Sequence, residues 1–493
     1  MFWIQSLLSG GVYAKDFQCL YGPMLIYPLL WVMNIFGETV LVERYFKYVL
    51  DSAAFLIIIF FLFRTLRWNA MFLVSSILYI LTFYTYYTSD VSVNGTELRV
   101  ALGILPLLLA YQSNGKRYHL LGAGVIAGQS LLFSQEVGIC SVLSVIAFSI
   151  VDNLVERNWR SFIKEIGLLF IGCAASVTPM LIFFSLNGAL MPFLTDLYEY
   201  PKLVTLGYGS LPFPAFKDFA KNPFSDVLFY YWPILSYMFV SIYLFLLIFM
   251  RKIDKGLALR VSLLVFGVLL FRTALGRSDE FHIRFAYAPA FLTLFLSLDK
   301  AITGIFKNKE RHLRAGSLII AILIVGFSAL LYSQTNIRAS ISSGLKDLAR
   351  LHEKFTIADQ GYEIPSIERG GIFFDPSTAS SIMQMDFFLR SNTSPGDYVY
   401  FFPNEAAYYF LFNRNNPTRY SMSYLAVTSA QKRELVAQLE QKKPEYIIYS
   451  LRTWRIDGIN EDIQVPEVVR YMRKKYGIYR QFEDFLVLKR SAI

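Results

Sequence analysis

Charged side chains gather in four short stretches of this 493-residue chain, and each stretch lies beside or between long apolar runs. Lys15 and Asp16 follow a pair of glycines, and Glu97 precedes Arg99 by two residues. Arginine and lysine can hold a phosphate through charge-assisted hydrogen bonds, and a carboxylate can take a proton from an attacking hydroxyl group. These residue types suit a phosphate site with a carboxylate base. The four stretches are residues 15–16, 90–99, 134–136 and 276–284.

The fourth stretch contains Arg277, Asp279 and His282 within six residues. Ionisable groups near hydrocarbon are costly, so their clustering there indicates a functional site. A second interpretation stays open, because loops between helices are normally polar and an interfacial Arg277–Asp279 ion pair is worth little. Asp51 lies one helical turn from Lys47 inside an apolar run, which favours an intramembrane ion pair over a catalytic role.

The composition sets the context for these groups. Hydrophobic residues make up 55% of the chain and charged residues only 17%, with a mean hydropathy of +0.43, whereas a soluble domain is about 25% charged. The apolar runs recur often enough to predict a polytopic helical membrane bundle. The net charge of +10 resides largely in short loops, so we expect no nucleic-acid partner. The predicted spans are 45–63, 70–88, 98–112, 119–134, 137–152, 165–186, 228–250, 261–275, 285–299 and 315–333.

Alternate loops between these spans differ in charge. One set holds more than twice as many Lys and Arg residues as the other, in less than half the length. The positive-inside rule places this basic set in the cytoplasm and the four charged stretches named above on the outer side. We therefore expect a multi-pass protein of the inner (plasma) membrane. The basic loops are 64–69, 113–118, 153–164, 251–260 and 300–314.

Residues 334–493 differ in character from the spans that precede them. Helical patterns near 378–390, 405–412 and 429–441 alternate with short apolar runs at 397–402, 446–449 and 485–488. This alternation predicts a small extracytoplasmic α/β domain. The predicted fold class is thus mainly α, a polytopic α-helical membrane bundle with a C-terminal α/β domain. The predicted divisions are 1–44 as an outer-face segment with short juxtamembrane helices, 45–333 as the bundle, and 334–493 as the α/β domain.

A long outer loop, residues 187–227, is rich in proline, glycine and aromatic residues. Proline and glycine argue against one long helix, and aromatic side chains suit the bilayer interface. A lid over an interfacial pocket would need this composition, with Tyr198, Tyr200 and Tyr208 as its candidate contacts. A merely interfacial loop would have the same composition, so both interpretations remain open.

The sequence offers no dedicated metal site. It contains no HExxH or CxxC motif, and the histidines outside the fourth stretch have no ligand spacing. It also contains no GxGxxG fingerprint and no P-loop, so nucleotide binding is unsupported.

Four runs resemble the GT-C class of polytopic glycosyltransferases: GGVYAKDFQCLYGPMLIYPLL, NGTELRVALGILPLLLAY, SQEVG and ALGRSDEFHIRFAYAPA. Within that class the sequence looks most similar to bacterial members related to protein O-mannosyltransferases and lipid A aminoarabinose transferases. The resemblance covers most of residues 1–300, and the C-terminal domain also looks like those that end many such chains. The G-x-x-Y-x-x-D-F-x-x-x-Y-G-P run is moderately specific.

The resemblance implies a polyprenyl-phosphate-linked sugar as donor and a lipid, glycan or protein as acceptor, used outside the cytoplasm. It implies catalytic roles for Asp16 and Glu97. For the lipid phosphate or the sugar it implies Arg277 and His282, with Lys15, Arg99 and Asp279 as further candidates. No cofactor is certain, although some relatives use a divalent cation and the acids here could hold one loosely.

The family pattern begins with a helix and an acidic pair ahead of the region that matches residues 3–5. We therefore expect that an upstream segment belongs to this protein; alternatively, residues 22–37 themselves span the membrane. Two other functions stay open. A transporter or flippase for a lipid-linked glycan would need charges buried in mid-span, and a non-catalytic envelope scaffold would act through its outer domain.

Overall fold

The structure is a computed structural model that is predominantly helical and divides into two compact units. The first unit comprises residues 1–46, 182–202 and 352–493, and the second comprises 47–181 and 203–351. The three-part division expected from the sequence stays a prediction. The structure describes residues 1–19, 21–89, 96–113, 116–156, 159–205, 209–215, 224–250, 254–307, 322, 364, 366–372, 374, 376–453 and 455–491.

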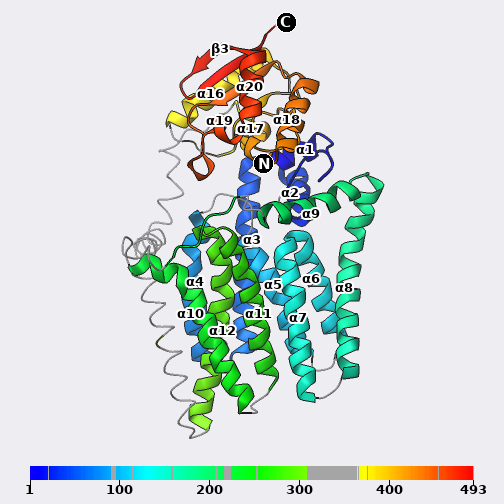
Figure 1. The fold of residues 1–493 in the computed structure, drawn as a ribbon, viewed down its shortest axis with the longest axis vertical. Helices are drawn as coiled ribbons and strands as arrows, with labels where there is room; N and C mark the ends of the chain where they lie inside the picture. The colour runs from blue at the N-terminus through cyan, green and yellow to red at the C-terminus, as the bar shows by residue number, and fades with distance from the viewer. Residues whose placement is uncertain are drawn as a thin grey trace. The chain divides into compact units, whose positions relative to one another are not determined.

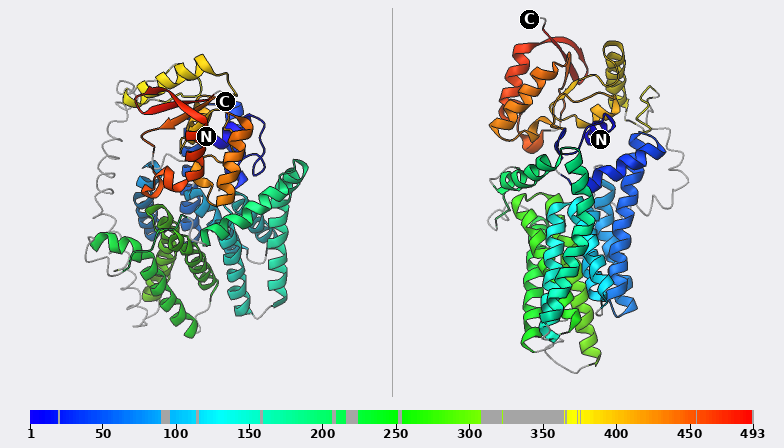
Figure 2. Two further views of the ribbon diagram at one scale, coloured as in Figure 1. Left: turned by 45° about the horizontal axis from the view of Figure 1, so that its top comes forward. Right: turned by 90° about the vertical axis from the view of Figure 1, so that its right-hand side faces the viewer.

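The second unit is a bundle of apolar helices that run side by side in all three views (Figures 1 and 2). Nine of the ten predicted spans fall on helices of the described part, and the tenth, 315–333, lies outside the described residues apart from residue 322. The helices are α3 (Val40–Thr65), α4 (Asn69–Ser89), α5 (Thr96–Gln112), α6 (Arg117–Phe133), α7 (Gln135–Glu156), α8 (Trp159–Leu186), α10 (Phe224–Phe249), α11 (Lys255–Gly276) and α12 (Glu280–Lys307).

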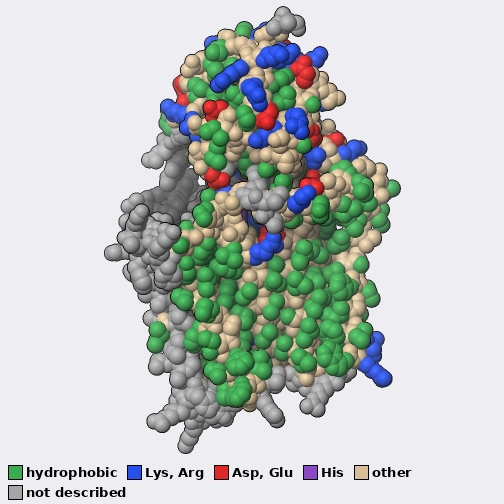
Figure 3. Space-filling view, viewed as in Figure 1, with side chains coloured by type: hydrophobic (Ala, Val, Ile, Leu, Met, Phe, Trp, Pro, Cys, Tyr) green, Lys and Arg blue, Asp and Glu red, His purple; other side chains and the backbone are tan. Residues whose placement is uncertain are grey.

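Within the described residues, six of these helices contain stretches long and apolar enough to cross a membrane. The face drawn in Figure 3 is almost continuously hydrophobic over the bundle helices, as lipid contact requires. Fold and composition together give a multi-pass membrane protein. The stretches are Val40–Thr65, Gln135–Leu154, Trp159–Leu186, Phe229–Phe249, Lys255–Gly276 and His282–Thr303.

Small residues let the bundle helices approach closely. Gly124 of α6 and Gly172 of α8 face each other, and a Cβ atom at either position would collide with backbone of the opposite helix. This is the packing that membrane helices use where burial of apolar surface supplies little driving force. The intramembrane pair expected at Lys47 and Asp51 is confirmed, with Lys47 Nζ donating to Asp51 Oδ2 at 2.6 Å.

The first unit combines the N-terminal segment with the C-terminal α/β domain. In the described part, four strands form one sheet in the order β1-β2-β4-β3; β1 and β2 are parallel, and the other neighbours are antiparallel. The elements of this unit used below are α1 (Phe2–Leu8), α2 (Pro23–Phe36), α9 (Leu190–Thr205), α16 (Pro376–Asn392), β1 (Tyr400–Phe402), α17 (Ala406–Leu411), α18 (Ser429–Lys442), β2 (Tyr446–Ser450), α20 (Pro466–Lys475), β3 (Tyr476–Phe482) and β4 (Phe485–Arg490).

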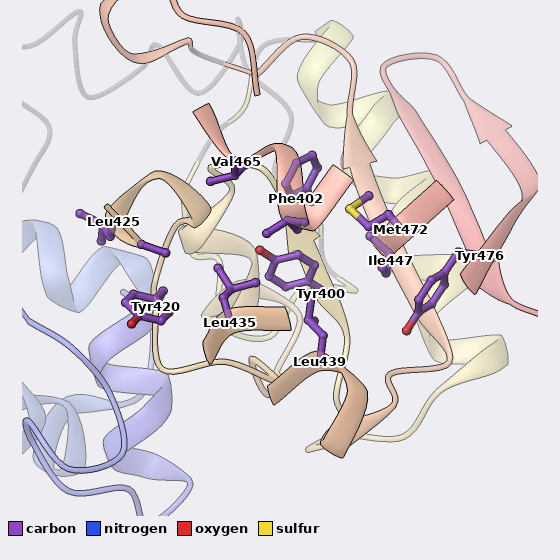
Figure 4. Close-up of a cluster of buried hydrophobic side chains, with 12 residues drawn as sticks. Tyr400, Phe402, Tyr420, Leu425, Leu435, Leu439, Ile447, Val465, Met472 and Tyr476 are labelled. Carbon is purple, nitrogen blue, oxygen red and sulfur yellow. The ribbon is translucent and has the colours of Figure 1, made fainter. Parts of the chain in front are cut away.

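The core of the C-terminal domain is an aromatic and aliphatic cluster between the sheet and helices α18 and α20 (Figure 4). Phe402 on β1 and Ile447 on β2 are fully buried against Leu435 and Leu439 of α18. Helix α18 begins with a capping box, in which the Thr428 side chain accepts from the Gln431 backbone and Gln431 reaches back to Thr428. The sequence had indicated α16, α17, α18, β1, β2 and β4 within a few residues, but not α20 and β3.

Candidate functional site

One charged cluster lies where α11 ends and α12 begins, in the second unit. Arg277 Nε donates to Asp279 Oδ2 at 2.6 Å, and His282 Nδ1 lies 2.6 Å from Asp279 Oδ1. The same carboxylate accepts from the backbone N–H of His282 at 3.0 Å, so Asp279 caps the N-terminus of α12. All three side chains are partly exposed. We call residues 277, 279 and 282 the α11–α12 cluster.

The α11–α12 cluster is held from a second direction by the chain that precedes α10. Arg277 Nη1 donates to the carbonyl oxygen of Gly209 at 2.7 Å, and the backbone N–H of Ser278 donates to the carbonyl oxygen of Leu211 at 3.1 Å. The guanidinium group is therefore fixed by a carboxylate on one edge and a carbonyl on another. A planar fork held in this way is preorganised to bind an oxyanion.

Asp279 carries the negative charge of the α11–α12 cluster. Burial alone would raise the pKa of its carboxyl group, but hydrogen bonds from the His282 side chain and backbone and from Arg277 outweigh burial and lower the pKa to about 2. An ionised carboxylate accepts only, so Nδ1 is the donating nitrogen of His282. Asp279 is consequently a fixed anion that orients its neighbours and does not exchange protons near neutral pH.

The predicted pair Glu97 and Arg99 lies in the first turn of α5. The Arg99 guanidinium sits 5.0 Å from the centre of the Phe285 ring, and the His282 ring centre is 6.4 Å from the same ring. Phe285 therefore links Arg99 to the α11–α12 cluster, and nothing in the sequence pattern had marked it. The structure thus brings together Arg99, Arg277, Asp279 and His282, with Glu97 on the same helical turn as Arg99.

Other charged groups predicted for the outer loops fare differently. Glu136, in the first turn of α7, accepts a hydrogen bond from Thr273 of α11 at 2.8 Å, so it faces the last turns of that helix. Asp90 lies outside the described residues.

Lys15 and Asp16 lie in the first unit, in a tight loop after α1. The Asp16 backbone N–H donates to the Val12 carbonyl at 2.9 Å, and the Asp16 carboxylate accepts from the Val12 N–H at 2.8 Å. Ala14 takes a φ of 65°, which is uncommon for a residue with a Cβ atom. Both charged side chains are exposed, and Lys15 Nζ donates to the Asn187 carbonyl at 3.1 Å.

Two residues beside this loop were missed by the sequence interpretation. Arg419, in the C-terminal domain, contacts the Ala14 carbonyl and both carboxylate oxygens of Asp196 on α9, each at 3.4 Å. Burial raises the pKa of Asp196, and Arg419 only partly offsets this effect. Each of the three segments is ordinary in sequence, so only the folded chain reveals their meeting.

The predicted lid residues divide between the described and undescribed parts. Residues 190–205 of the loop form helix α9, which carries Tyr198 and Tyr200 in its second half. Tyr198 is 67% exposed, and Lys202 Nζ lies 5.6 Å from its ring centre. Tyr208 lies outside the described residues. The lid role stays a prediction, as does the convergence of Lys15 and Asp16 with the residues of the second unit.

A metal centre finds no support in the described part of the chain, where no three His, Cys, Asp or Glu side chains gather as ligands. Asp279 pairs instead with Arg277 and His282, and Asp196 pairs with Arg419.

Comparison with known proteins gives matches in structure but not in sequence. No family model matches this sequence, and no curated protein sequence matches it. The crystal structure of ArnT from Cupriavidus metallidurans bound to undecaprenyl phosphate is similar over 100% of this chain and 92% of that chain, at 12% identity and a TM-score of 0.53. The apo state of the same protein has equal coverage and identity and a TM-score of 0.50.

An oligosaccharyltransferase from Archaeoglobus fulgidus, tethered to an acceptor peptide, is similar over 99% of this chain and 69% of that chain, at 12% identity and a TM-score of 0.48. At such identities, structural similarity speaks for the fold alone. The expected fold class, a mainly α helical bundle with a small C-terminal α/β domain, is confirmed, and the similarity to the fold of ArnT covers 100% of this chain.

Proposed function

We propose that the protein is an integral-membrane glycosyltransferase that moves a sugar from a polyprenyl-phosphate donor to an extracytoplasmic acceptor. The similarity in fold to ArnT, which was solved with undecaprenyl phosphate, supports a lipid-phosphate ligand. The charge asymmetry of the loops supports an outer location for the α11–α12 cluster and for the C-terminal domain.

The observation that carries this proposal is the preorganised guanidinium of Arg277. In the proposed reaction the acceptor oxygen or nitrogen bonds to the anomeric carbon, and the bond from that carbon to the phosphate oxygen breaks. The phosphate leaves with the bonding electrons and gains negative charge. Arg277, with Arg99 and Lys15 as further cations, stabilises that charge, which grows most in the transition state.

The acceptor proton needs a base. Asp16 and Glu97 are the proposed catalytic bases, because each carboxylate is close in the chain to a cation: Asp16 follows Lys15 in the loop after α1, and Glu97 precedes Arg99 in the first turn of α5. Asp16 is exposed and held by the Val12 N–H, so its second oxygen is open to an acceptor. His282, oriented by Asp279, is the proposed contact for the sugar or the phosphate. Tyr198, Tyr200 and Tyr208 are proposed to cover the bound donor.

The test uses the full chain in lipid nanodiscs. Undecaprenyl phosphate titrated into the sample should bind, and a panel of polyprenyl-phosphate sugars with lipid, glycan and peptide acceptors should yield free polyprenyl phosphate and a glycosylated acceptor. Movement of intact donor across sealed vesicles, with no release of polyprenyl phosphate, would instead identify a flippase. A binding-competent protein that neither transfers nor moves the donor would contradict the proposal.

A further inference from the structure

The loop that carries Lys15 and Asp16 packs against aromatic rings through Tyr13. The Tyr13 ring stacks on Phe184 with centres 5.5 Å apart and an interplanar angle of 9°, and it meets Phe17 and Phe193 at 6.0 Å. These contacts hold the Tyr13 and Phe17 side chains in place, whereas the side chains of Lys15 and Asp16 are exposed.

The backbone on either side of Lys15 and Asp16 contacts Arg419. Its guanidinium Nη2 reaches the Ala14 carbonyl, immediately before Lys15, and its own carbonyl accepts from the Gln18 N–H at 2.8 Å. One residue of the C-terminal domain thus contacts the loop on both sides of the Lys15–Asp16 pair. Figure 4 shows the neighbouring Tyr420 on the side of the domain core nearest the N-terminal ribbon.

Arg419 is itself fixed by acids from two further elements. The carboxylate of Asp196 on α9 accepts hydrogen bonds from Arg419 Nη2 at 3.4 Å, and the carboxylate of Glu434 on α18 lies 3.9 Å from Arg419 Nη1. Glu434 also accepts from the Tyr420 hydroxyl at 2.7 Å, and Gln438 accepts from the Arg419 backbone N–H at 2.9 Å. The guanidinium is therefore a junction between the loop, α9 and the C-terminal domain.

The Asp196–Arg419 pair has a form that suits positioning. Its side chains are only 25% and 22% exposed, so water screens the attraction less than at a free surface. Removing one partner would leave the other charge half-buried and uncompensated. A lysine at position 419 would keep the charge but could not span the Ala14 carbonyl and the carboxylate with one planar group.

We propose that Arg419 is a positioning residue, which with Asp196 clamps the loop that presents Lys15 and Asp16. The inference rests on the proposed function, in which that loop supplies a catalytic acid. It assigns to the C-terminal domain a direct part in shaping the site, and it couples the loop to α9, the helix that carries Tyr198 and Tyr200. The clamp acts on turnover through the geometry of Asp16, while the Arg277 guanidinium in the second unit binds the donor phosphate.

Cys19, at the end of the loop, gives a readout that needs no activity. It is 8% exposed, its Sγ accepts from the Tyr21 N–H at 3.4 Å, and burial raises the pKa of its thiol. A buried thiol of raised pKa reacts slowly with maleimide. Replacing Cys140 and Cys173, which lie in α7 and α8, by alanine leaves Cys19 as the only labelling site.

In this single-cysteine background, Arg419→Ala and Asp196→Asn should raise the maleimide labelling rate of Cys19 at least tenfold, and Arg419→Lys by less. Arg433→Ala is the matched control, because Arg433 is an exposed arginine of α18 in the same domain. It should leave the rate unchanged. Asp196→Asn keeps the side-chain shape, so it reports on the clamp even if Arg419→Ala lowers the yield of folded protein.

Steady-state transfer by the same variants completes the experiment. Arg419→Ala and Asp196→Asn should lower kcat about tenfold or more and leave the KM for the donor within about twofold. Unchanged labelling in both variants overturns the clamp, whatever the activity. Faster labelling with wild-type kcat overturns the link from clamp to transfer. If the wild-type chain transfers no sugar, the proposed function fails, and the labelling rates still decide whether Arg419 holds the loop.

Discussion

The α11–α12 cluster and the Arg419 junction place charged side chains in two different ways. Arg277, Asp279 and His282 come from six consecutive residues, and the start of α12 brings them together through a helix cap. Arg419, Asp196 and Ala14 come from segments more than 170 residues apart. A cluster built by local geometry is visible in sequence, whereas one built by packing is not.

The two regions also differ in their electrostatics. Asp279 has its pKa lowered to about 2, because hydrogen bonds outweigh its burial. Asp196 has its pKa raised, because burial outweighs its single guanidinium partner. A cap supplies backbone donors aimed at the carboxylate, and the Asp196 pair lacks them in the described contacts. The carboxyl group of Asp279 therefore stays ionised to a lower pH than that of Asp196.

The largest expected effect comes from the proposed bases, one in each unit. Asp16→Ala and Glu97→Ala should each lower the rate of sugar transfer by about 1,000-fold, since a positioned base contributes on the order of 10²–10⁴. Protein abundance should stay unchanged. Transfer by purified variants, with immunoblots of the membranes, measures both. Wild-type turnover in both variants would defeat the assignment, and loss in only one would identify the unit that supplies the base.

The second-largest expected effect is on binding of the lipid phosphate by Arg277. Arg277→Ala should weaken binding of undecaprenyl phosphate and lower transfer by about 100-fold, because a charge-assisted donor is lost and Asp279 is left without its guanidinium partner. Arg277→Lys should keep part of the binding. Arg64→Ala, an exposed arginine in the last turn of α3, serves as the control. Equal affinity in wild type and Arg277→Ala would remove the α11–α12 cluster from the site.

A smaller effect follows from the pKa of Asp279. The folded-state value of about 2 lies below the ordinary 3.8, so the carboxylate stabilises the fold above about pH 4, and this contribution is lost as the pH falls through 2. Its size is at most about 2 kcal/mol. The melting temperature of wild type should thus fall more steeply between pH 4 and pH 2 than that of Asp279→Asn. Parallel curves would show that the hydrogen bonds contribute little.

The smallest effect tests the support behind Arg419. Thr428→Ala removes the capping box of α18, the helix that carries Glu434 and Gln438, and should cost about 1 kcal/mol of unfolding free energy. Thr428→Ser should retain most of it. Thermal melting measures the loss, and Cys19 labelling should rise less than in Arg419→Ala. A larger rise than in Arg419→Ala would mean that α18, and not the guanidinium, holds the loop.

The sequence by itself determined the features that depend on local spacing. Apolar runs of helical length predict the bundle, because hydrocarbon demands that each span satisfy its own backbone. The spacing of Lys47 and Asp51 predicted their ion pair, and the order of residues 277–282 predicted a charged cluster. The apolar run 446–449 predicted strand β2. Strand β3 was not predicted, because its middle residues are exposed at the edge of the sheet and are not a run of apolar residues.

Tertiary structure alone decided which distant groups meet. Nothing near Arg419 in the chain distinguishes it from Arg433, yet one reaches the N-terminal loop and the other is exposed on α18. In sequence Phe285 is one of many apolar residues in a predicted span, and only the structure shows its contacts with Arg99 and His282. Hydrophobic periodicity records which face of an element is buried, but it carries no information on the partner against which that face packs.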